Sequence, residues 1–155
     1  MNRSSSLSRG FKAITLTALL FASGAQQVFA ANLRLEAKLI WATNDPKSPD
    51  PKHKELDAVM SEKLRRAFKW KNYFECNRVV QSVASRSSSR FELSKKCTIE
   101  IKEIEGPKIE IKLIGDGKEV HKTTKTISKG QPVVYSGDDK NQNGWFVIIT
   151  ELDVK

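Results

Sequence analysis

The sequence predicts an α+β fold: a mainly antiparallel β-sheet, curled or sandwich-like, with one amphipathic helix packed on it. Two observations lead to this prediction. Most of the chain after residue 71 alternates apolar and charged residues with a period of two, which is typical of half-buried strands. Only the segment near 51–69 repeats its apolar residues at intervals of three and four, as an amphipathic helix does.

Residues 1–30 have the three-part pattern of a secretory signal peptide. A basic start without acidic residues precedes the apolar run 13–22, and Val28 and Ala30 stand at positions minus three and minus one of a cut after Ala30. A run of ten residues is too short to span a bilayer, which needs about 20. We therefore expect export to the periplasm or secretion. The mature chain, 31–155, should be a single β-rich domain without an integral membrane span.

The net charge is moderately positive. The chain has 27 basic and 18 acidic residues; three basic residues lie in the leader, which leaves 24 and 18 in the mature domain and a net charge of +6. Such a charge allows weak attraction to polyanions. However, lysines and glutamates alternate along the strands instead of gathering, so nucleic acid is not favoured as a partner.

A proline-containing segment separates the first predicted strand from the predicted helix. Apolar residues alternate with charged ones over 33–41, and three prolines within 43–51 end that strand. Asp50 before Pro51 predicts the helix start, and basic residues near Lys69 suit its C-terminal end. The predicted helical apolar stripe comprises Leu56, Val59, Met60, Leu64, Ala67 and Phe68.

Charges select the register of the next hairpin. A turn at Glu105-Gly106-Pro107 pairs Ile101 with Ile111 and Ile99 with Leu113. The same register sets opposite charges against each other on the other face. These pairs are Glu100 with Lys112 and Lys102 with Glu110.

Three further strands are expected towards the C-terminus. After the turn at 115–117, the polar, lysine-bearing segment 119–127 is typical of a protected edge strand. Residues 131–136 and 145–150 form the last hairpin. Because 145–149 is apolar at every position, we expect that strand to be buried on both faces, with the helix on one of them.

Two cysteines in an exported chain favour a disulfide. Residues 72–84 and 90–104 have strand character on either side of the serine-rich loop 85–89, and a hairpin folded there sets Cys76 opposite Cys97. The alternative is two unpaired buried thiols. The sequence has no C-x-x-C motif, which argues against a redox or zinc site.

No catalytic residue is predicted, because the common nucleophile, zinc and phosphate-loop motifs are missing from the sequence. His53 and His121 are interpreted as solvated surface residues. Asp138 and Asp139 would indicate an enzyme only if they converged with Glu151 in one pocket.

One loop has the spacing of metal ligands. Asp139, Asn141 and Asn143 read D-x-N-x-N-G, like the first half of a calcium loop. A polar hairpin loop explains the same composition through turn geometry, and we favour that explanation, with calcium as the alternative.

The aromatic residues of 68–74 alternate with lysines and could stack on bases or sugars. They stand where the helix ends and a strand begins, however, so we expect them to pack between helix and sheet.

Segments 39–44 (LIWATN), 68–73 (FKWKNY) and 137–141 (GDDKN), the last followed by Trp145-Phe146-Val147, resemble small exported proteins of verrucomicrobial bacteria. The resemblance implies a bacterial envelope or periplasmic setting and carries over no functional residues. The expected function is that of a non-enzymatic module, without a cofactor, that binds or scaffolds a macromolecule of the envelope. The alternatives are an enzyme acting on cell-envelope material and a polyanion- or calcium-dependent binding domain.

Overall fold

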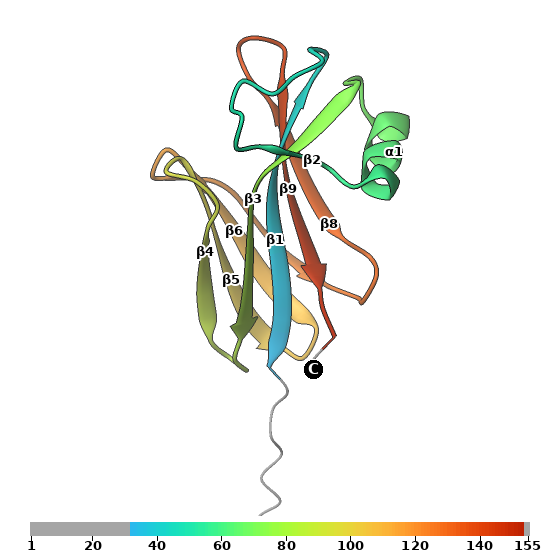
Figure 1. Ribbon diagram of the computed structural model, residues 1–155. Coiled ribbons are helices and arrows are strands. Elements are labelled where there is room, and N and C mark those ends of the chain that lie inside the picture. Colours follow the sequence, from blue (N-terminus) through green and yellow to red (C-terminus); the bar gives the residue numbers. More distant parts are fainter. Residues whose placement is uncertain (1–31, 154–155) are drawn as a thin grey trace, which may run out of the picture.

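A computed structural model describes residues 32–153; the predicted leader lies outside them. Two antiparallel sheets pack face to face, and one helix covers the outer side of one sheet (Figure 1), which confirms the predicted α+β class. Sheet A has the order β2-β3-β1-β9-β8 and sheet B the order β4-β5-β6-β7. The elements are β1 Leu33–Thr43, β2 Lys54–Glu55, α1 Ala58–Ala67, β3 Asn72–Val83, β4 Ser88–Glu92, β5 Cys97–Glu105, β6 Lys108–Gly115, β7 Lys118–Thr126, β8 Val133–Asp138 and β9 Gly144–Glu151.

The main core fills the space between the sheets. Alternating residues of each strand point inward, as a sandwich requires. Sheet A contributes Leu35 and Ala37 of β1 with Val147 and Ile149 of β9, and all are at most 1% exposed. The isoleucines of β5 and β6 meet them from sheet B: Ile99, Ile101, Ile109 and Ile111.

Strand β9 is buried on both faces, as predicted. Val147 and Ile149 face the sandwich core, whereas Phe146 and Ile148 belong to a second cluster beneath α1. Leu56 and Leu64 are buried in that cluster, with Met60 and Phe68 packed against it. A strand covered by a sheet on one side and a helix on the other needs no polar face.

The β5–β6 hairpin has the predicted register, with Ile101 opposite Ile111 and Glu100 opposite Lys112. Lys112 Nζ lies 3.3 Å from Glu100 Oε2. Glu110 forms its ion pair with Lys122 of β7, at 3.3 Å. The edge position predicted for 119–127 is also confirmed, since β7 ends sheet B and is almost wholly exposed.

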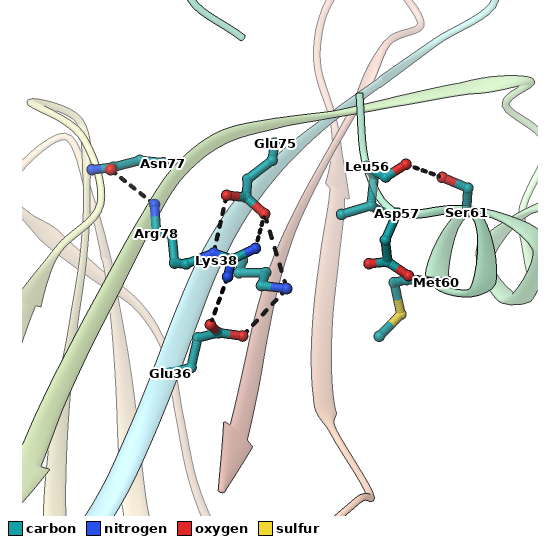
Figure 2. Close-up of polar contacts among 9 residues, drawn as sticks. All are labelled: Glu36, Lys38, Leu56, Asp57, Met60, Ser61, Glu75, Asn77 and Arg78. Atoms are coloured by element: carbon teal, nitrogen blue, oxygen red, sulfur yellow. Dashed lines mark hydrogen bonds and ion pairs between the residues drawn. The ribbon is translucent and has the colours of Figure 1, made fainter. Parts of the chain in front are cut away.

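The helix is shorter than 51–69. Asp57 caps it, and its Oδ1 accepts the N–H of Met60 at 2.9 Å (Figure 2). Asp50 forms a turn instead, because residues 54–55 are held extended by pairing with β3. Two residues of the predicted stripe are also misplaced: Val59 is 69% exposed and Ala67 is exposed.

The predicted disulfide is wrong: Cys76 and Cys97 are free thiols. Strand β3 pairs with β1, and the segment expected as one strand over 90–104 breaks at residues 93–96 into β4 and β5, which pair with each other. The cysteines therefore lie in different sheets.

A buried carboxylate stabilises the turn that connects β3 of sheet A to β4 of sheet B. Glu103 is 2% exposed and accepts the backbone N–H of Arg86, and its own N–H donates to the Ser87 carbonyl at 2.9 Å. These bonds tie the turn after β3 to sheet B, which the loop composition alone did not indicate.

Candidate functional site

Sheet A is longer than sheet B at one end, and this difference leaves a cleft. The upper parts of β1, β3 and β9 extend beyond the turns that end sheet B (Figure 1). Leu39, Trp41 and Trp145 lie on the inner face of this extension and are only partly buried. The resulting cleft has a volume of about 520 Å³.

Two indoles form the sheet A wall of the cleft. Trp41 and Trp145 are direct partners across β1 and β9. The ring of Trp145 lies against Gly137 of β8, where an added Cβ would clash with it. Glycine is therefore required at this position for the indole to pack this closely against the neighbouring strand.

The opposite wall is aliphatic. Leu113 and Ile114 come from β6, and Val120 of β7 is 57% exposed at the cleft mouth. Polar groups are confined to the connections around the cleft, namely Ser94, Lys96, Asp116 and Asp139.

Cys76 is one of the residues that line this cleft. The β1–β3 register shifts here, since Leu39 pairs with Asn77 and Ile40 with Glu75, so Cys76 is the extra residue of a β-bulge. Bulges redirect side chains and often occur beside functional sites. Cys97 lines the same cleft from sheet B.

An imidazole and a carboxylate stand behind the Cys76 thiol. Cys76 Sγ lies 3.7 Å from His53 Nδ1, and His53 Nε2 lies 3.9 Å from Asp50 Oδ2. Ser48 Oγ is also 2.6 Å from His53 Nδ1. The interpretation of His53 as a solvated residue is therefore wrong, since its side chain is 18% exposed. Sequence spacing gave no sign of this group, which depends on the loop 44–53 returning to β3.

The Cys76 thiol is protonated at neutral pH. Burial raises its pKa to about 11; a hydrogen bond with the Trp41 backbone opposes this shift, and the charges of Asp50 and Glu75 reinforce it. Burial also raises the pKa of Cys97.

Beside the thiol, the outer face of sheet A carries a compact ionic network (Figure 2). Lys38 Nζ lies 3.2 Å from Glu36 and 3.9 Å from Glu75, while Arg78 lies 3.2 Å from Glu36 and 2.9 Å from Glu75. The hydrogen bond to Glu75 raises the pKa of Arg78. Two bases and two acids compensate each other, so this cluster offers little net charge to a polyanion.

The loop with calcium-like spacing is held by its own hydrogen bonds. Asp139 Oδ1 accepts the N–H groups of Asn141 and Asn143, both at 2.8 Å. The Asp139 N–H donates to the Asn143 carbonyl at 2.8 Å. This Asx-type turn matches the structural explanation for the Asp/Asn composition.

The carboxylates suggested for an enzyme do not converge. Asp138 contacts Lys69, with 3.1 Å between Oδ2 and Nζ. Glu151 lies at the far end of β9, opposite Leu35, whereas Asp138 is opposite Gly144 at the near end.

The aromatic cluster at the helix end packs as predicted. Phe68, Trp70 and Tyr73 surround Phe146, with ring centroids 4.7, 5.7 and 5.9 Å away. His121 is exposed, as expected, and its ring lies 5.3 Å from that of Tyr135.

Comparisons with protein-family models, with curated proteins and with solved structures find no significant match to this chain. Among residues 32–153, no helix is long and apolar enough to cross a membrane.

Proposed function

We propose that this protein is an exported binding module whose cleft takes an apolar acyl or alkyl chain of an envelope molecule. The observation that carries the proposal is the extension of sheet A beyond sheet B, which leaves Trp41 and Trp145 only partly buried in one cleft that the exposed Val120 of β7 also lines. Apolar side chains kept exposed in this way mark a binding surface.

The size and lining of the cleft fit such a ligand. Its volume of about 520 Å³ falls in the range of about 300–1,000 Å³ typical of small-molecule sites. The walls are aliphatic and aromatic, and the polar groups stand around them. The ligand therefore buries a chain in the cleft and keeps its polar part at the mouth, where it can stay attached to a larger envelope molecule.

Export follows from the signal-peptide pattern of residues 1–30 and fits the envelope setting implied by the verrucomicrobial resemblance. All strands and the helix described here lie after Ala30, so cleavage there leaves their pairing intact. The exported protein should begin at or near Ala31. Intact-mass measurement tests this, and a mature species that retains the leader contradicts it.

Ligand binding is tested with octanoate and with the fluorescent probe 1-anilinonaphthalene-8-sulfonate. We expect octanoate to displace the probe from the wild-type protein. Val120→Arg, which places a charge at the cleft mouth, should weaken both ligands at least about tenfold, a loss of about 1.4 kcal/mol.

Val59→Arg is the matched control, because Val59 is similarly exposed, at 69%, but lies on α1 away from the cleft. It should bind both ligands like the wild type. Equal weakening by the two substitutions, or no saturable binding to the wild type, would refute the proposed function.

A further inference from the structure

We propose that Cys76 is a nucleophile that accepts the acyl group of an activated ester, with His53 as its base and the acyl chain lying in the cleft. This inference rests on the proposed function, because the chain must enter the cleft for its carbonyl group to reach the thiol.

Three chemical groups stand in the order that acyl transfer requires. The Cys76 thiol faces His53 Nδ1 at 3.7 Å, and the other ring nitrogen faces Asp50 Oδ2 at 3.9 Å. A nucleophile beside a base that is itself oriented by a third group is the recurring arrangement of covalent catalysis. A carboxylate facing Nε2 favours the proton on that nitrogen, which leaves Nδ1 as an acceptor within reach of both the Ser48 hydroxyl, at 2.6 Å, and the Cys76 thiol, at 3.7 Å.

A hydroxyl group and a thiol group both lie close to Nδ1, namely Ser48 Oγ and Cys76 Sγ. Their positions relative to the apolar cleft indicate which of them is the nucleophile. Ser48 Oγ is closer, at 2.6 Å, but Ser48 lines the shallow surface formed by its own loop and not the apolar cleft. Cys76 lines the apolar cleft together with Leu39 and Trp41, and it also lines the polar groove between β2 and β3. The thiol is thus the group that meets a carbonyl at the end of a bound chain, and Ser48 acts as a positioning residue for the imidazole.

The step conserves atoms and charge. As Cys76 Sγ attacks the carbonyl carbon, its proton passes to His53 Nδ1 and a carbon–sulfur bond forms. The bond between the carbonyl carbon and the leaving oxygen then breaks, and the imidazolium returns the proton to the leaving alkoxide. The products are a thioester on Cys76 and a free alcohol.

The resting state of the thiol is consistent with this role. Because Cys76 is protonated at neutral pH, the proton must leave during the attack, which makes a base within contact distance necessary. Cys97 is the internal comparison. It lines the same cleft but has no imidazole contact among the described hydrogen bonds.

The experiment uses p-nitrophenyl octanoate and p-nitrophenyl acetate as probes. The wild type should release about one equivalent of nitrophenolate per chain and gain one octanoyl group, which peptide mapping places on Cys76. The octanoyl ester should react at least about tenfold faster than the acetyl ester, because only its chain fills the cleft.

Variants separate the roles of the residues. Cys76→Ser and His53→Ala should each lower the rate at least about tenfold, and added imidazole should restore part of the rate of His53→Ala only. His121→Ala removes an exposed imidazole that does not line the cleft, and it should retain the octanoyl adduct. If His53→Ala does not fold, Asp50→Asn replaces it, with a smaller expected loss.

Two results would overturn the proposal. One is octanoylation of Cys97 or of lysines at the same rate as Cys76. The other is the lack of any adduct in a protein that still binds octanoate, which would leave the binding function standing. Loss of octanoate binding itself would instead refute the proposed function.

Discussion

Truncation of Ile148 to alanine tests how sheet A is covered. Ile148 is 1% exposed and lies between β9 and α1, in the cluster with Phe146 and Leu64. The substitution removes three carbon atoms, worth roughly 2.5 kcal/mol in transfer free energy at about 0.8 kcal/mol each. The remaining cavity adds about 24 cal/mol per Å³, so we expect a loss of about 3–4 kcal/mol in the free energy of unfolding.

Urea denaturation followed by circular dichroism measures this loss, and two exposed substitutions provide the scale. Lys112→Ala removes a surface ion pair with Glu100, which is worth under about 1 kcal/mol. Val59→Ala trims a side chain that is 69% exposed on the same helix, so its cost should also stay below about 1 kcal/mol. A harmless Ile148→Ala, or losses equal to those of the two controls, would show that α1 does not seal this face of β9.

The remaining predictions concern the cleft and its surroundings. Gly137→Ala should cost about 1–3 kcal/mol by overpacking against the Trp145 ring, and an unchanged unfolding midpoint would contradict that contact. Denatured protein without reductant should show Cys76 and Cys97 as two titratable thiols. In the native protein, the rate of Cys76 alkylation by iodoacetamide should rise with pH up to about 11, because the thiolate is the reactive form. Since the folded state holds this proton more tightly, stability should fall as pH rises from about 8.5, the ordinary thiol pKa, towards about 11, and a Cys76→Ser variant with the same decline would contradict this. Asp139→Ala should lower stability by about 1–2 kcal/mol through two lost hydrogen bonds; calcium should not raise the melting temperature, and an Asp139-dependent rise would favour the metal explanation.

Local patterns in the sequence were sufficient for most of the strands. The alternation of isoleucine with charged residues defined β5 and β6, and the charges fixed their register because a slip of two residues would have opposed Lys102 to Lys112. The unbroken apolar run of β9 predicted cover on both faces, because a strand with no polar side cannot face water. These properties depend on neighbours along the chain or across one short turn.

The pairing of β3 was decided by the tertiary structure. Its sequence suits a partner on either side, and the serine-rich loop after it suggested the wrong one. The buried carboxylate of Glu103 in β5 accepts the backbone N–H of Arg86. This hydrogen bond holds the turn after β3 against sheet B, so the chain continues into that sheet. A contact between residues so far apart in the chain leaves no periodic trace in the sequence, so the disulfide inferred from local spacing was wrong.

The candidate site could likewise not be predicted from the sequence alone. In the sequence, His53 stands in a proline-rich loop without a recognisable motif, and Cys76 was predicted to form a disulfide. The two side chains come into contact because the loop returns to β3 at the position of its bulge. The cleft lies where sheet A extends beyond sheet B. Strand propensity and alternation are local and can be read residue by residue, whereas the relative extent of two packed sheets is set by long-range contacts that form only when the whole chain has folded.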